Sequence, residues 1–294
     1  MTILMTGLCE KGADQIWKQC NDAMYAQGVT WLEEAAYAGD AEAWFFLGHC
    51  YSWGDGAVGF NEKKAYECYL RGASAGSARA VLGALRAGQY DEQMKQSARY
   101  SIEESYRQVR DAAEMGDVYA AWQMGEAVEW EDLADYMPQT ESAREQCLFW
   151  YERAADGGII PAMVKMGKCC QNGTYREKDE KEALRWANQC AASGEVWGLF
   201  QMGEHYRQEE DWEAAFQYDY AAAKQGSSRA MLYLGQMYLN GQGTERDIQA
   251  AVQALEGAAA RNEAESFEEL GNLFYQDELV ERDDEKAFYW YGKA

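Results

Sequence analysis

An apolar residue followed by glycine recurs seven times along the chain at regular intervals. The intervals run from 32 to 42 residues, and the glycines are Gly48, Gly83, Gly125, Gly167, Gly203, Gly235 and Gly271. Each stands inside a segment with the apolar spacing of a helix, where glycine costs about 1 kcal/mol relative to alanine. Seven such costs predict seven places where another helix approaches the backbone closely.

The segment 229–262 shows one complete unit. Ala230, Leu234 and Tyr238 fall on one face of a first helix, Gly241 and Gly243 interrupt that spacing, and a second helix starts near Asp247. Units of helix, turn and helix that repeat in this way stack into an array whose length is not limited by a single core. We therefore expect one elongated all-α domain, an α/α superhelix (solenoid) of antiparallel helix-turn-helix repeats.

The glycine register also gives the expected boundaries. Residues 1–40 are predicted to form a degenerate capping hairpin with helices over 14–24 and 29–39. Seven repeats then occupy 41–76, 77–116, 117–158, 159–194, 195–226, 227–262 and 263–294. The polar insertion near 88–101 predicts a long loop, and a second insertion lies near 129–142.

The chain is strongly acidic, with 50 acidic and 27 basic residues and a formal net charge of -23. This charge opposes binding to nucleic acid or to an anionic membrane surface and favours a neutral or basic protein partner. The sequence shows no secretory signal and no stretch of eighteen apolar residues. A cytoplasmic protein without a membrane span is expected, and the oligomeric state stays open.

The eight cysteines do not recur with the repeat, as a disulfide framework in a solenoid should. Buried free thiols are expected instead. Cys169 and Cys170 lack the ligand spacing of a metal site, and the turn at 241–243 recurs at 54–56 as a structural element rather than a phosphate-binding loop. We expect neither a metal nor a cofactor.

Written in register, the units share A-x-x-x-[LM]-G-x-x-Y, a glycine-containing turn, and K-A-x-x-W-Y-x-K-A-A-x-x-G. The second half is clearest in KAFYWYGKA at 286–294 and in WYERAA at 150–155. This pattern resembles the Sel-one-like repeat (SLR) family, a relative of the tetratricopeptide repeats, over 39–294. The resemblance implies a right-handed superhelix that serves as an adaptor or scaffold for other proteins and has no shared catalytic motif. The unit 77–116 departs most, because it lacks the first-helix tyrosine and the Trp-Tyr pair.

Polar positions along the first helices define the expected partner groove. Positions +3, +6 and +10, counted from the small residue that opens each first helix, share one face, and first helices line the concave side of such solenoids. The candidate groove residues are Phe46, His49, Trp53, Gln123, Glu126, Trp130, Lys165, Lys168, Gln201, Glu204, Tyr233 and Gln236. Trp53 and Trp130 either anchor a partner or pack on their own repeats. Lys165 and Lys168 either hold an acidic group of a partner or form a solvated basic spot.

Two classes of function fit these features. The first is an interaction scaffold that binds a partner segment in the groove, with Phe46, Trp53, Trp130 and Tyr233 as anchors and with weak salt dependence. The alternative is an acidic inhibitor or immunity-type protein that masks a basic surface, with an affinity that falls steeply with salt. A catalytic role is expected least, because no recognisable motif places a serine or cysteine nucleophile with His49.

Overall fold

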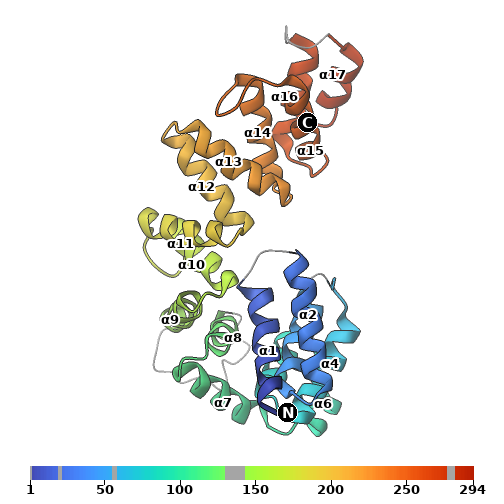
Figure 1. The fold of residues 1–294 in the computed structure, drawn as a ribbon, viewed down its shortest axis with the longest axis vertical. Coiled ribbons are helices and arrows are strands. Elements are labelled where there is room, and N and C mark those ends of the chain that lie inside the picture. Colours follow the sequence, from blue (N-terminus) through green and yellow to red (C-terminus); the bar gives the residue numbers. More distant parts are fainter. Residues whose placement is uncertain (1, 19–21, 55–57, 130–142, 277–281) are drawn as a thin grey trace. The chain divides into compact units, whose positions relative to one another are not determined.

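The computed structural model describes residues 2–18, 22–54, 58–129, 143–276 and 282–294 of the chain. These residues form α-helices and no strand (Figure 1), so the all-α prediction is confirmed. The helices are α1 (Thr2–Trp17), α2 (Asp22–Tyr37), α3 (Ala41–Trp53), α4 (Glu62–Ala75), α5 (Ala78–Arg86), α6 (Glu92–Ser97), α7 (Ile102–Glu114), α8 (Val118–Glu129), α9 (Ala143–Asp156), α10 (Ile160–Asn172), α11 (Glu180–Ala192), α12 (Val196–Gln208), α13 (Trp212–Lys224), α14 (Ser228–Asn240), α15 (Ile248–Ala259), α16 (Ala264–Gln276) and α17 (Asp284–Tyr291).

Successive helices pack in pairs, as the repeat pattern predicts. The pairs are α1 with α2, α3 with α4, α5 with α7, α8 with α9, α12 with α13, α14 with α15 and α16 with α17. Second helices also pack against the first helix of the next pair, as α13 does against α14. The chain divides into two compact units, Met1–Ala183 (unit 1) and Leu184–Ala294 (unit 2), and α11 crosses from one to the other.

Capping residues set the ends of the first helices. Ser77 and Ser227 each accept a hydrogen bond from a backbone N–H in the first turn of α5 and α14, which satisfies a donor that the helix itself leaves open. Gly54 and Gly241 end α3 and α14 with φ of 77° and 67°, in the left-handed region that favours glycine. These ends reverse the chain and bring the second helix back alongside the first.

The repeated glycines lie where a second helix meets the first. A Cβ at Gly48 would lie 2.6 Å from the ring of Tyr69, and one at Gly125 would lie 2.7 Å from the ring of Tyr151. Both tyrosines come from the second helix of the same pair. The predicted close approach is therefore confirmed at these glycines, and the approaching group is an aromatic side chain.

Replacing Gly48 by alanine is expected to lower the free energy of unfolding by about 1–3 kcal/mol. The added methyl group would overlap the Tyr69 ring, and such overpacking outweighs the gain of about 1 kcal/mol in helix propensity. Gly7→Ala is the control, because a Cβ at that helical position has no atom within 4 Å. Urea unfolding followed by circular dichroism measures both variants, and a Gly48→Ala protein as stable as the wild type would contradict the close contact.

The insertion near 88–101 is not the long loop that was expected. It contains α6, whose Met94 is fully buried and whose N-cap residue, Asp91, accepts a hydrogen bond from the Tyr66 hydroxyl at 3.0 Å. The short helix packs against α4 because Met94 is an apolar residue in an otherwise polar segment. Most of the second insertion, 130–142, lies outside the described residues.

The helices of the first hairpin also begin and end earlier than predicted. α1 ends at Trp17 and α2 begins at Asp22, so Gly28 lies inside a helix rather than in the turn. A Cβ at Gly28 would lie 2.9 Å from the carbonyl oxygen of Gly12, and the reverse distance is the same. The two glycines therefore let α1 and α2 cross closely. Gly28 thus marks a helix contact and not the turn that was expected between 24 and 29.

The cysteines behave as ordinary core residues. The seven that lie within the described residues are buried thiols outside any disulfide, as predicted, and Cys20 lies outside that part of the chain. Burial raises the pKa of the Cys68 and Cys147 thiols to about 12, so both stay protonated at neutral pH. Within the described residues no three histidine, cysteine or acidic side chains gather as a metal site would require. None of the described helices is long and apolar enough to cross a membrane.

Candidate functional site

The N-terminal end of the expected groove is filled by aromatic rings. Trp17 of α1 lies with its ring centroid 5.2 to 6.2 Å from those of Phe46, His49, Tyr119 and Trp122, and we call these five residues the aromatic cluster. Phe46 is 3% exposed and His49 is 6% exposed. The structure thus places Phe46, an expected anchor, in the core, because α1 supplies the ring that packs on it.

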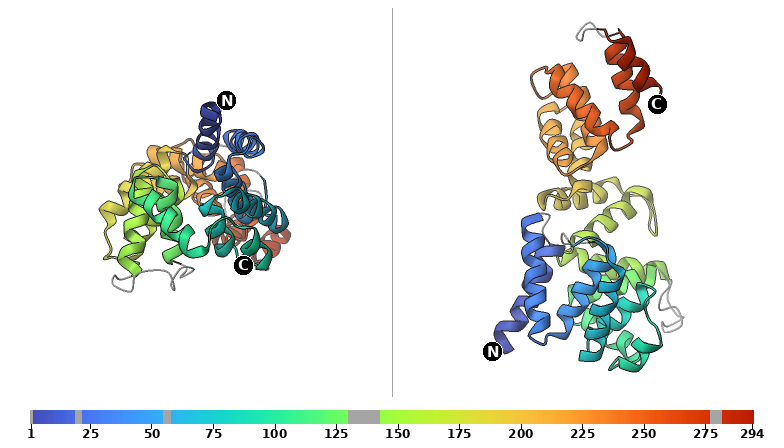
Figure 2. Two further views of the ribbon diagram at one scale, coloured as in Figure 1. Left: turned by 90° about the horizontal axis from the view of Figure 1, so that it is seen from below. Right: turned by 90° about the vertical axis from the view of Figure 1, so that its right-hand side faces the viewer.

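Polar contacts accompany these rings where α1 meets α8. The Tyr119 hydroxyl donates a hydrogen bond to Asp14 at 2.6 Å, and Lys18 pairs with the same carboxylate at 2.9 Å. Side chains of α1 and α8 consequently meet within unit 1; the two helices are neighbours in Figure 1, and Figure 2 shows the fold from two further sides. Trp17 lies outside the repeat register, so reading the repeats in columns missed it.

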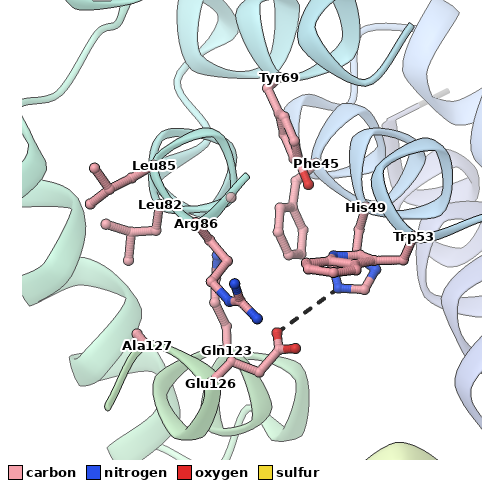
Figure 3. Close-up of a pocket in the computed structure, with 11 residues that line it drawn as sticks. Phe45, His49, Trp53, Tyr69, Leu82, Leu85, Arg86, Gln123, Glu126 and Ala127 are labelled. Carbon is pink, nitrogen blue, oxygen red and sulfur yellow. Dashed lines mark ion pairs between the residues drawn. The ribbon is translucent and has the colours of Figure 1, made fainter. Parts of the chain in front are cut away.

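A hollow opens beside the aromatic cluster, between α3, α5 and α8 (Figure 3). We call it the unit 1 hollow. Each of the three helices is the first helix of its pair, as expected for the groove side of the repeats. The hollow is lined by His49 and Trp53 of α3, Leu82 and Arg86 of α5, and Gln123 and Glu126 of α8, among others.

The unit 1 hollow combines an aromatic face with charged groups. The Trp53 side chain is 48% exposed, and the guanidinium carbon of Arg86 lies 5.0 Å from its ring centroid. A Glu126 carboxylate oxygen lies 3.9 Å from His49 Nε2. Trp53 therefore packs partly on Arg86 of the next repeat and remains half-exposed.

Other predicted groove residues have internal contacts. The Gln123 amide donates to the backbone carbonyl of Arg79 at 3.0 Å and ties α8 to α5. Lys165 pairs with Glu129 and does not line the unit 1 hollow, and Lys168 is exposed on the same helix. Trp130, the remaining candidate in this unit, lies outside the described residues.

Unit 2 contains a hollow of its own, which we call the unit 2 hollow. It lies along α14, with walls from α12 and α16, and includes two predicted groove residues, Tyr233 and Gln236. The Gln236 amide donates a hydrogen bond to Glu269 at 3.0 Å. The other lining residues include Arg207, Trp212, Asn240 and Gln242. Gln201 and Glu204, the two candidates on α12, are half-buried.

An ion pair between a buried acid and a lining arginine forms part of the wall of the unit 2 hollow. Asp219 of α13 is 0% exposed and pairs with Arg207, whose guanidinium carbon lies 3.7 Å from the centroid of the Tyr233 ring. Asp219 faces Gly203, whereas Tyr151 faces the corresponding Gly125 in unit 1. Burial raises the pKa of Asp219 to about 6, against the opposing effect of Arg207. Sequence reasoning missed this pair, although an acid at a position that is aromatic in other repeats was its visible signal.

The raised pKa of Asp219 predicts a pH-dependent stability. A carboxyl group with a folded-state pKa near 6 and an ordinary value of 3.8 stabilises the fold most below 3.8, and this contribution is lost as the pH rises through 6. Relative to Asp219→Asn, the wild type should gain about 1 kcal/mol of unfolding free energy between pH 7 and pH 5. Urea titrations of both proteins at the two pH values measure this difference. A difference that stays constant with pH would contradict the raised pKa.

Comparison with known proteins places these observations in a family. The Sel1 repeat pattern matches residues 23–40, 41–77, 118–159, 160–195, 228–262 and 268–294. An uncharacterised protein of Neisseria meningitidis serogroup B is 26% identical over 195 residues, which are 65% of this chain and 38% of that protein. The chain thus spans well under half of the length of this relative.

Two solved structures have a similar fold. A protective antigen of uropathogenic Escherichia coli strains, described as displaying an SLR fold, superposes with a TM-score of 0.54 and 21% identity over 92% of this chain and 66% of that one. A Sel1 repeat protein from Oxalobacter formigenes gives a TM-score of 0.50 and 22% identity over 92% and 91%. The pattern covers more than half of the sequence and the fold agrees with it, so the chain belongs to the Sel1 repeat family of α/α solenoid proteins, which are generally non-catalytic scaffolds.

Proposed function

We propose that this protein is a non-catalytic interaction scaffold in the cytoplasm, and that it binds a segment of a neutral or basic partner protein at the unit 1 hollow. One observation carries the proposal: a half-exposed tryptophan, Trp53, lies in a hollow lined by three first helices, together with Arg86 and Glu126. Tryptophan and arginine are the residues most often found at the energetic centre of protein interfaces.

The surroundings of Trp53 support this role. Its ring lies 6.2 Å from His49, which is held among the rings of Trp17 and Trp122. A wall that is already packed loses little conformational entropy when a partner binds. Glu126 adds a negative charge that suits a basic or neutral partner.

The position of His49 supports a structural role rather than a catalytic one. The imidazole is 6% exposed and contacts the aromatic rings of three neighbouring tryptophans. A general base has to reach the proton that it removes from a substrate. An imidazole enclosed in this way serves better as part of the wall behind the hollow.

Affinity purification with Trp53→Ala tests the proposal. The wild-type protein should retain a partner at about 0.1 M salt and at several-fold higher salt, where exposed charges are largely screened. Trp53→Ala should weaken that partner at least about tenfold, which is a usual loss for a central aromatic anchor. Tyr37→Ala is the control, because it removes an exposed aromatic ring of α2 that does not line the hollow.

The outcomes separate the two candidate functions. A partner that survives high salt and depends on Trp53 supports the scaffold. A partner that is lost at high salt and binds Trp53→Ala as well as the wild type would overturn the proposal in favour of an acidic inhibitor that masks a basic surface.

A further inference from the structure

The unit 2 hollow has the features of a binding site that is separate from the unit 1 hollow. All of its lining residues belong to unit 2, and Arg207, Tyr233 and Glu269 come from the first helices of three successive pairs, α12, α14 and α16. First helices line the groove side of these repeats. The hollow therefore continues, within unit 2, the kind of surface on which Trp53 lies in unit 1.

The ion pair in the wall of this hollow is not needed for packing. Where Asp219 faces Gly203, another repeat of the same unit fills the equivalent space with Leu255 against Gly235. A buried ion pair stabilises a fold no better than well-packed apolar residues, because both charges lose their hydration. What the pair does here is hold Arg207 against the Tyr233 ring, which fixes one wall of the hollow.

The charges around the unit 2 hollow leave an excess of negative charge. Asp219 neutralises Arg207, so the half-buried Glu269 and the nearby Glu204 are not balanced by that guanidinium. The region 184–294 as a whole has twenty acidic and nine basic residues. A cationic group is thus attracted to the hollow, and an anionic one is repelled.

Side-chain amides supply the rest of the surface. Gln236 and Asn240 lie one helical turn apart on α14, and Gln242 follows in the turn after it. An amide side chain both donates and accepts hydrogen bonds, as a peptide backbone does. Tyr233 and Trp212 add aromatic surface at the edge. Amides in a row along a helix therefore fit an extended polypeptide better than a compact anion.

We propose that the unit 2 hollow binds an extended peptide segment, with a lysine or arginine of that segment paired to Glu269 and its backbone hydrogen-bonded to Gln236 and Asn240. The inference rests on the proposed function in one respect, that the ligand is a protein. The site, the charge of the ligand and the residues that recognise it are independent of the unit 1 hollow.

Selection from short random peptides displayed on phage, with the 294-residue chain as the bait, tests this site. The enriched peptides should contain lysine or arginine, and their affinity is measured by fluorescence anisotropy of labelled synthetic copies. Glu269→Gln should weaken them about tenfold, because glutamine keeps the shape and can still accept the Gln236 hydrogen bond but loses the charge. Glu268→Gln is the matched control, since it removes the same charge from an exposed neighbour on α16.

A charge exchange tests direct pairing. Glu269→Lys should bind the selected peptide poorly, and should regain affinity for a peptide whose basic residue is replaced by glutamate. Peptides without basic residues, equal binding by Glu269→Gln and the wild type, or failure to select any peptide would each overturn the inference. Peptides that depend on Trp53 and not on Glu269 would also overturn it, while leaving the proposed function of the unit 1 hollow in place.

Discussion

Trp17→Ala is expected to lower the free energy of unfolding of unit 1 by about 3–5 kcal/mol, the usual loss for a fully buried tryptophan. The indole is 2% exposed and contacts four aromatic rings that belong to α3 and α8. No other side chain described on α1 contacts so many rings. Removing it should therefore loosen α1 as well as leave a cavity.

Two measurements test the Trp17→Ala prediction. Urea unfolding by far-ultraviolet circular dichroism gives the loss of stability, and hydrogen exchange of the α1 amides reports whether the helix detaches. Trp53→Ala removes the same side chain from a half-exposed position next to His49 and should cost about 1 kcal/mol or less. If Trp17→Ala were no less stable than Trp53→Ala, the aromatic cluster would not hold α1 in place.

The repeat register could be predicted because most repeats place a glycine of the first helix against a side chain of a second helix. Gly48 contacts Tyr69, and Gly125 contacts Tyr151, from the second helix of the same pair. Both glycines stand out in the sequence because glycine inside a helix lowers its stability. The turn glycines and the serine caps are equally local. Helix pairs and their order therefore followed from periodicity alone.

The burial of Phe46 could not be predicted in the same way. Its exposure is decided by Trp17, and the hydrogen bond from Tyr119 to Asp14 joins residues 105 positions apart in the sequence. A sequence pattern that recurs in every repeat indicates contacts between neighbouring helices only. The approach of α1 to α8 depends on the rotation from each repeat to the next, summed over several repeats, and no single repeat determines that sum.

Several candidate groove residues line one of the two hollows. Trp53, Glu126 and Gln236 were named as groove residues, and each lines a hollow. Arg207 and Asp219 were not named, because equivalent positions of the repeats were compared for what they share. Asp219 is an exception, since Tyr151 and Leu255 take the corresponding position in other repeats. The departure of Asp219 from the repeat pattern was the signal in the sequence, because an acidic residue at a core position needs a partner for its charge.

Asp219→Ala is expected to lower the free energy of unfolding by about 3–5 kcal/mol at pH 7, because it leaves the half-buried Arg207 charge without its partner. The effect is measured by urea unfolding of the full chain. Glu213→Ala is the control, since it removes an exposed carboxylate from the same helix and should change stability by about 0.5 kcal/mol or less. A small loss in Asp219→Ala would mean that Arg207 reaches solvent when it is released.

Replacing both partners distinguishes stability from recognition. Arg207→Leu with Asp219→Leu replaces both charges, and Leu at 219 takes the place that Leu255 has against Gly235 in the next repeat, so the double variant should be within about 1 kcal/mol of the wild type or more stable. The ion pair then contributes no net stability, and its presence requires another reason. Weaker binding of the selected basic peptides by this stable variant would supply that reason, because the wall formed by Arg207 and Tyr233 would be the only feature lost.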